Sequence, residues 1–233
     1  YDFSGYDSIF HVAGIAHIST RKLSAVQRSS YWQVNANLPV EVAKKAKQAG
    51  VGQFIFLSSM SVYGEIGRWK PPIIISKETQ PAPKDIYGQS KFYAEEGICA
   101  FANDSFRTCI LRPPMVYGSG AKGNYAKLVK LSKHISVFPM IENIRSMIHI
   151  ERLCACLKEA VDSRRTGIIH PQDPVYSCTA TMVLNLANKQ GRQIRLSPML
   201  GKAVQLLFYI PGGLGRMALK AFGSLVYAMD IDK

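Results

Sequence analysis

Apolar segments of strand length alternate with long helical segments through the first half of the chain, and this order limits the possible folds more than any other feature. Residues 8–13, 53–58 and 107–112 are predicted strands, and the second is almost continuously apolar, as is typical of a strand buried on both faces. Helical patterns over residues 24–49 and 86–103 separate them. This β-α-β-α-β order predicts an α/β fold with a doubly wound parallel sheet, helices on both faces and right-handed crossovers.

The second half differs in its predicted secondary structure: helical patterns dominate and the extended segments are short. We therefore divide the chain into residues 1–118, the sheet-bearing part, and residues 119–233, a smaller and mostly helical lobe across the carboxyl ends of the strands, with some strands returning to the main sheet. The expected helices are 124–133, 149–162, 179–189 and 201–222, the last interrupted at Pro211, and the expected extended pieces are 167–170 and 192–197.

Composition narrows the class of protein. The formal net charge is +13, which favours polyanionic ligands such as nucleotides, nucleic acid or an acidic membrane surface. No basic stripe with interleaved aromatic residues is present, so we do not expect a nucleic-acid partner. The 5 cysteines are scattered without zinc spacing, which predicts reduced thiols, a cytoplasmic location and no metal site. No segment reaches the ~20 apolar residues of a membrane span, and no signal peptide opens the chain.

A dinucleotide-binding sheet normally opens with a strand, a G-x-G-x-x-G loop and a helix, and that opening does not precede Ser8. The run Gly212-Gly213-x-Gly215 follows a helical pattern instead of a strand, so it does not fit a phosphate loop. We therefore expect the chain to begin in the middle of a sheet, without the first two β-α units of ~30 residues each.

The strongest chemical signal is Tyr87-Gly-Gln-Ser-Lys91, a Y-x-x-x-K pattern on a predicted helix. The i, i+4 spacing places the phenol and the ammonium group on one face. A free tyrosine, with a pKa of ~10, is a poor base at neutral pH. A neighbouring lysine favours the phenolate, so that the pair can exchange a proton with a substrate hydroxyl.

Hydroxyl groups and a cation lie where open α/β sheets bind their ligands. Ser58, Ser59 and Ser61 follow the strand at residues 53–58, at its carboxyl end. The segment 111–118, LRPPMVYG, leaves the next strand at the same edge, and Arg145-Ser-Met-Ile-His-Ile-Glu151 lies beyond it.

Together these segments resemble the extended short-chain dehydrogenase/reductase family, with its Rossmann-like fold, and within it the NAD-dependent sugar-nucleotide epimerase/dehydratase branch typified by UDP-glucose/galactose 4-epimerases. The resemblance runs from about Asp7 to Leu153, in the order of the family. The matching stretches are HVAGIAH (11–17), Asn35, FIFLSSMSVYG (54–64), YGQSK (87–91), LRPPMVYG (111–118) and RSMIHIERL (145–153).

The resemblance implies a role for each matching residue. Tyr87 is similar to the catalytic acid/base of the family, Lys91 to its partner that also binds the nicotinamide ribose, and Ser59 to the hydroxyl that positions the reacting oxygen. Ser59 is preferred because it stands four residues before Tyr63. The implied cofactor-binding residues are Val12, Ala13, Gly14, Asn35, Ser58, Tyr87, Lys91 and Pro114.

The implied substrate-binding residues are Ser59, Met115, Asn124 and Arg145. Asn124 resembles the Asn that begins the helix facing the substrate diphosphate, and Arg145 resembles the Arg that pairs with that diphosphate. Met60 and Ser61 replace the Asp-Glu pair of sugar 4,6-dehydratases, which disfavours dehydration. Met60 also replaces the Cys of GDP-fucose-forming enzymes. His149 is expected to be structural.

The resemblance thus implies epimerisation or reduction of a nucleotide-diphosphate sugar with NAD as cofactor, in polysaccharide or cell-envelope sugar synthesis, by a homodimer. NADP stays open, because the segment that selects between the two cofactors lies outside the sequence. Two alternatives also stay open: a ketone or sterol-type reductase of the same fold, and a catalytically silent nucleotide-binding remnant.

Overall fold

The computed structural model describes residues 2–16 and 23–233, and its chain divides into two compact units. Unit 1 contains residues 1–64, 79–114 and 150–171, and unit 2 contains residues 65–78, 115–149 and 172–233. The units interleave along the chain, because the segment 150–171 supplies a strand to the sheet of unit 1. The sequence-based division after residue 118 included the return of some later strands to the main sheet, and this segment contains such a strand.

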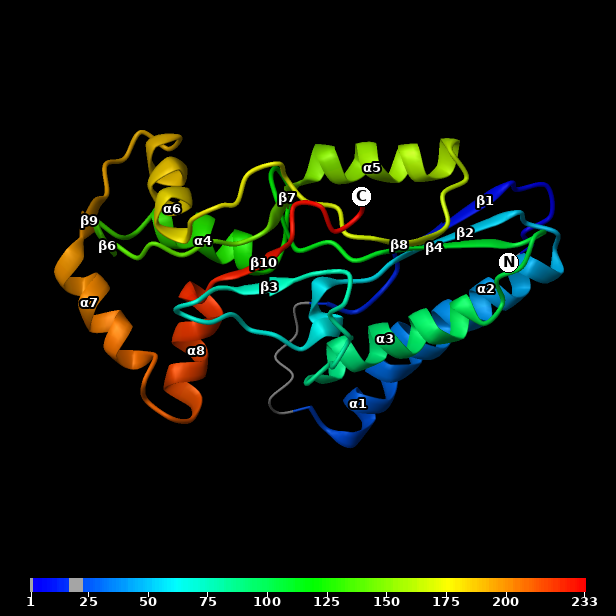
Figure 1. Cartoon of the computed structure of the whole chain (residues 1–233), viewed down its shortest axis with the longest axis horizontal. Helices are drawn as coiled ribbons and strands as arrows, with labels where there is room; N and C mark the ends of the chain where they lie inside the picture. The colour runs from blue at the N-terminus through cyan, green and yellow to red at the C-terminus, as the bar shows by residue number, and fades with distance from the viewer. Residues whose placement is uncertain (1, 17–22) are drawn as a thin grey trace. The chain divides into compact units, whose positions relative to one another are not determined.

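Unit 1 contains a four-stranded parallel sheet in the order β1-β2-β4-β8. Figure 1 shows one helix, α5, over one face of this sheet and the helices α2 and α3 over the other. The strands are β1 (Ser8–His11), β2 (Gln53–Leu57), β4 (Arg107–Leu111) and β8 (Gly167–Ile169). The helices are α1 (Ala25–Trp32), α2 (Leu38–Gln48), α3 (Ile86–Cys99) and α5 (Ile150–Asp162). The predicted doubly wound sheet is therefore confirmed.

The core of unit 1 lies between the sheet and α2 and α3. Small residues of the helices, Ala43, Ala46 and Ala94, allow the aromatic side chains of the strands to approach closely. The buried cluster is completed by Val51, Phe54, Phe56, Ile98, Phe106 and Ile110. The continuous apolar run of β2 is explained by this packing, since four of its five residues are buried.

The helical segment predicted over residues 24–49 is continuous but not uniform. Ser24 caps α1, and a π-helical turn, Gln33–Asn37, joins α1 to α2. A π-helical turn adds a residue to the local winding, and such turns are frequent at functional sites. Here the turn contains Asn35, which is fully buried.

Unit 2 consists of helices and three pairs of parallel strands. The pairs are β10 (Leu225–Tyr227) with β3 (Ile73–Ile75), β5 (Met115–Tyr117) with β7 (Met147–His149), and β6 (Val137–Pro139) with β9 (Arg195–Ser197). The helices are α4 (Asn124–Ser132), α6 (Thr179–Asn188), α7 (Pro198–Leu207) and α8 (Gly213–Phe222). The core of this unit surrounds Phe138, with Ala180, Val183, Ala187 and Ile194.

Candidate active site

The carboxyl ends of β2 and β4 are joined by backbone hydrogen bonds that continue beyond the strands. The Ser58 amide donates to Leu111 O (2.7 Å) and the Met60 amide donates to Pro113 O (2.9 Å). Ser59 then caps a short 3₁₀ turn, Met60–Tyr63, and its Oγ accepts from the Ser61 amide (3.2 Å). The hydroxyl-rich segment after β2 is therefore fixed by the backbone at the sheet edge predicted from the sequence.

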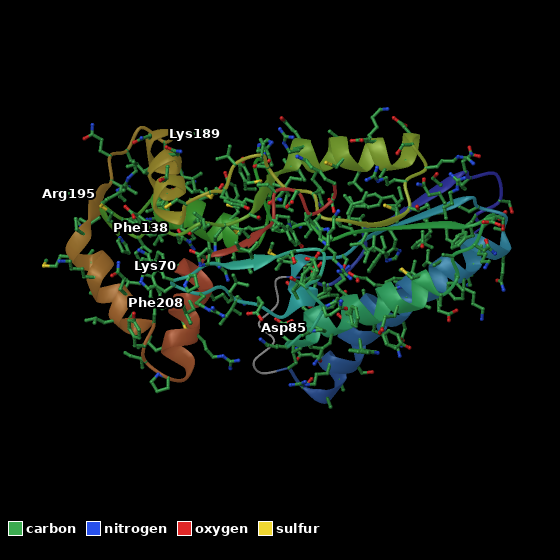
Figure 2. The ribbon with its side chains drawn as sticks, viewed as in Figure 1. Lys70, Asp85, Phe138, Lys189, Arg195 and Phe208 are labelled. Carbon is green, nitrogen blue, oxygen red and sulfur yellow. The ribbon has the colours of Figure 1, made fainter. Side chains whose placement is uncertain are left out.

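The first turn of α3 lies against this 3₁₀ turn. Asp85 caps α3 by accepting from the Gly88 amide (2.8 Å), and Figure 2 labels it at the start of the helix. A Cβ atom at Gly88 would come within 2.5 Å of Ser61 O, so only glycine permits this approach. Tyr87 is the neighbour of Gly88, and the close packing therefore brings its side chain to the segment that contains Ser59.

The Tyr87 phenol lies close enough to the Ser59 hydroxyl for the two groups to interact. Burial raises the pKa of Tyr87 above its ordinary value, the interaction with Ser59 acts in the opposite direction, and the charge of Asp85 adds to the increase. In contrast, the Ser58 hydroxyl donates to Glu95 in the interior. Of these two serines, Ser59 thus has its hydroxyl beside the tyrosine.

Lys91 follows Tyr87 by one helical turn and is 4 % exposed. Its Nζ donates to Leu57 O (2.9 Å) and lies 4.5 Å from the ring centroid of Phe56. Burial lowers the pKa of Lys91 to about 8, although the charge of Glu95 opposes the shift. The ammonium group is therefore charged at neutral pH and held at the end of β2.

A small cradle adjoins Lys91 at the end of β1. A Cβ atom at Gly14 would lie 3.1 Å from Asn35 Oδ1 and 3.5 Å from Lys91 Nζ. The Asn35 side chain fixes the backbone of the next residue, Ile15, through two hydrogen bonds. Its Oδ1 accepts from the Ile15 amide (2.7 Å) and its Nδ2 donates to Ile15 O (2.8 Å). A side-chain-free backbone next to an ammonium group is suited to a ribose or phosphate group, so these residues fit a dinucleotide.

His11, at the end of β1, also faces this region. Its Nε2 is buried without a hydrogen-bond partner among the described residues, and its ring packs 6.2 Å from that of Phe54. Burial, and then the charge of Lys91, lower the pKa of His11 to about 4. The imidazole is therefore neutral in the folded protein at neutral pH.

A pH-dependent loss of stability is expected from this histidine. Between pH 6.5 and about 4 the unfolded chain binds a proton at His11 that the folded chain does not, so the free energy of unfolding decreases as the pH falls. Replacement by phenylalanine (His11→Phe) should weaken that decrease, as measured by the melting temperature between these pH values. The exposed His134 provides the control, His134→Gln, which should keep the original profile. Identical pH profiles for His11→Phe and the parent protein would contradict this account.

A buried polar network, which the sequence did not reveal, supports the site from behind. Arg112 donates to Glu95 through Nε (3.2 Å to each carboxylate oxygen) and Nη2 (2.6 Å). Its Nη1 donates to Tyr63 Oη (2.8 Å), which in turn lies 2.7 Å from His170 Nε2. The network joins α3 to the carboxyl ends of β2, β4 and β8. The sequence contained one indication of this network: Glu95 follows Lys91 by four residues, which places both side chains on the same face of α3.

The structure places the other predicted residues as follows. Val12 and Ala13 are exposed after β1, and Pro114 is buried after β4; all three belong to unit 1. Met115 begins β5 and Asn124 begins α4, both in unit 2. His17, the last residue of the first matching stretch, lies outside the described residues.

Arg145 also belongs to unit 2, in the backbone that leads to β7. Its Nε donates to Gly223 O (2.9 Å) and its Nη2 to Ile66 O (3.4 Å). Burial lowers the pKa of Arg145 to about 10. Neither of these acceptors carries a formal charge, so the side chain is a half-buried cation held in place by carbonyl groups. The ring of His149, at the end of β7, packs edge-on against that of Tyr117, with 5.1 Å between the ring centroids.

Comparisons with known proteins identify the family of this chain. The model of the NAD dependent epimerase/dehydratase family matches residues 2–169, and the chain therefore belongs to that family. A UDP-glucose 4-epimerase of Vibrio cholerae is 37% identical over 185 residues, which are 77% of this chain and 56% of the relative. The chain thus spans just over half the length of that relative.

Two solved structures illustrate the fold. The UDP-glucuronic acid 4-epimerase of Bacillus cereus, in complex with NAD, gives a TM-score of 0.65 at 19% identity and is covered over 72% of its length by 93% of this chain. The dTDP-4-dehydrorhamnose reductase of Bacillus anthracis, in complex with NADP, gives a TM-score of 0.66 at 16% identity. The match covers 79% of the reductase and 93% of this chain. The predicted family, fold class and NAD-type cofactor are confirmed.

Proposed function

We propose that this chain carries the catalytic residues of an NAD-dependent epimerase that acts on a nucleotide-diphosphate sugar. The observation that carries the proposal is the packing of the first turn of α3 on the Ser59–Ser61 segment, which places Tyr87 beside Ser59, with Lys91 one turn further along the same helix. The 37% identity with a UDP-glucose 4-epimerase supports the choice of reaction and of substrate class.

In this mechanism Tyr87 accepts the proton of a sugar hydroxyl and later returns it. Ser59 donates a hydrogen bond to the reacting oxygen, which fixes that oxygen within reach of the phenol. The Tyr87 that accepts this proton is the phenolate, which the positive charge of the Lys91 ammonium group would stabilise against the effect of burial. When bound, NAD supplies the hydride acceptor and donor. Gly14, Asn35 and Lys91 would hold its ribose and phosphate groups, with Val12, Ala13, Ser58 and Pro114 around them.

The substrate would use residues of unit 2. Arg145 is suited to a diphosphate, because its guanidinium is half-buried among neutral acceptors and an anion would compensate its charge. We further propose that Asn124 donates to the same diphosphate from the start of α4, and that Met115 contacts the sugar.

The reaction can be tested with the full-length protein, UDP-glucose and UDP-galactose, followed by NMR of the sugar anomeric protons. Interconversion of the two sugars with catalytic NAD and without net formation of NADH is expected for an epimerase. Stoichiometric oxidation of NADPH by a keto sugar, without interconversion of the two, would instead identify a reductase and overturn the proposal. Binding of NAD without turnover of any nucleotide sugar would identify a silent remnant.

The biological setting is proposed on the same basis. We infer a cytoplasmic homodimer, assembled through α1, α2 and α3, that supplies sugars for polysaccharide synthesis. The outer faces of these helices expose apolar side chains, including Val26, Leu38 and Tyr93. Among residues 2–16 and 23–233 no helix is both long and apolar enough to cross a bilayer.

A further inference from the structure

Two short helices of unit 2, α7 and α8, form a hairpin whose outer surface is unusually apolar. Figure 1 shows them as successive helices joined by a tight loop. The side chains of Met199 (78%), Leu206 (69%) and Tyr209 (78%) are more than two-thirds exposed, although each would favour burial. The exposed apolar residues of the hairpin are Met199, Leu200, Leu206, Tyr209, Ile210, Leu214 and Met217.

The packing of the hairpin fixes which side chains point outward. A Cβ atom at Gly201 would lie 2.2 Å from Met140 O, so α7 rests on the backbone near β6 along its Gly201 side. Around the axis of α7, Met199 and Leu206 point roughly opposite to Gly201, and they therefore face outward. In α8, Gly215 approaches the carbonyl of Ile210 in the same way. The apolar surface is thus a consequence of glycine-mediated packing on the opposite face.

The charged residues of this region are all cationic. From residue 174 to residue 229 the sequence contains 6 Lys or Arg residues and no Asp or Glu. Lys202, Arg216 and Lys220 are exposed on the hairpin itself. The hairpin therefore combines exposed apolar side chains with positive charge alone.

An aromatic pair extends this surface at the loop. The ring of Trp69 lies 5.2 Å from that of Phe208, and Lys70 Nζ lies 5.4 Å from the Trp69 centroid. Figure 2 labels Lys70 and Phe208 beside the hairpin. Tryptophan and tyrosine next to lysine is the combination found at the interface between a membrane and water.

We infer that the α7–α8 hairpin binds the surface of a membrane that contains anionic phospholipids. Its outward Leu, Met and Tyr side chains would enter the boundary between headgroups and acyl chains, while Lys202, Arg216 and Lys220 contact the phosphates. Each helix has 10 residues, or ~15 Å, which is half of a ~30 Å hydrocarbon core, so the hairpin lies on the bilayer and does not cross it. A second copy of the chain fits less well, because two such surfaces would bring like charges together.

The test measures co-sedimentation of the full-length protein with vesicles of phosphatidylcholine, with and without phosphatidylglycerol. Binding is expected only with phosphatidylglycerol, and should weaken when ionic strength rises from ~0.15 M to ~1 M, because the Debye length shrinks from about 8 Å to about 3 Å. Both the charge variant Lys202→Glu/Arg216→Glu/Lys220→Glu and the apolar variant Leu206→Ser/Tyr209→Ser/Met217→Ser should lower the partition coefficient at least ~10-fold.

The control for the charge variant is Lys127→Glu/Lys130→Glu/Lys189→Glu, which has the same net charge and changes exposed lysines of unit 2 outside the hairpin. It should bind at least ~5-fold more tightly than the hairpin charge variant. The control for the apolar variant is Val175→Ser, at a position that is 71% exposed. Circular dichroism checks that each variant is folded.

Three results would overturn the inference: no binding of the parent protein to phosphatidylglycerol vesicles, equal binding of the hairpin variants and their controls, or a fall in oligomer mass by light scattering in the apolar variant with vesicle binding unchanged. The last result would assign the surface to a contact between copies. The outcome is independent of the proposed sugar chemistry, since no residue of the hairpin belongs to the candidate active site.

Discussion

A Tyr87→Phe variant is expected to turn over its nucleotide sugar ~10²- to 10⁴-fold more slowly than the parent protein, the usual cost of a lost general acid/base. The phenylalanine ring fills the same space, so packing beside Gly88 and the fold are retained. What is lost is the phenol oxygen beside Ser59. Turnover is measured by following the sugar product, and NAD binding by calorimetry, which should stay close to that of the parent.

Tyr93 provides a matched control on the same helix. It is 48% exposed on α3, and a Tyr93→Phe variant removes the same hydroxyl without touching Ser59 or Lys91. That variant should keep at least about half of the parent turnover. Parent-like activity in purified Tyr87→Phe protein would show that another group handles the proton.

The elements of the sheet could be predicted from the sequence because their signals are local. Strands β2 and β4 are short apolar runs bounded by polar or glycine residues, and α3 begins at an Asp that caps it. The sequence also indicated that some strands of the second half return to this sheet, and the extended pattern of β8 was visible. Which strand returns, and its pairing with Cys109 to Leu111 of β4, depend on tertiary packing and could not be assigned from local residues.

The same contrast holds within the candidate site. Tyr87 and Lys91 were identified because they stand four positions apart on one helix, and the hydroxyl segment because it ends a strand. The buried network was missed because its partners are far apart in the chain: Arg112 is 17 residues from Glu95 and 49 from Tyr63, and His170 is 107 from Tyr63. The π-helical turn that places Asn35 has no distinct sequence pattern either, since one amphipathic segment covered it.

The largest loss of stability is expected when the Glu95–Arg112 pair is broken. Both side chains are almost fully buried, at 4% and 5% exposure, and Nη2 lies 2.6 Å from the carboxylate. Burial alone would lower the pKa of Arg112, but the hydrogen bonds and charge of Glu95 raise it, so the arginine stays charged. A Glu95→Gln variant keeps the shape and removes the negative charge. It should lose ~3 to 5 kcal/mol of the free energy of unfolding, because a buried cation is left without its counter-charge.

Urea denaturation measures this loss, and two further variants show its origin. Glu96→Gln changes the next, exposed residue in the same way and should stay within ~0.5 kcal/mol of the parent protein. Removal of both charges in Glu95→Gln/Arg112→Gln should recover part of the stability lost in Glu95→Gln, because no unpaired charge is then buried. A loss below ~1 kcal/mol in Glu95→Gln would mean that water or a neighbouring acceptor compensates Arg112. The pair would then position Ser58 and α3 without being a main source of stability.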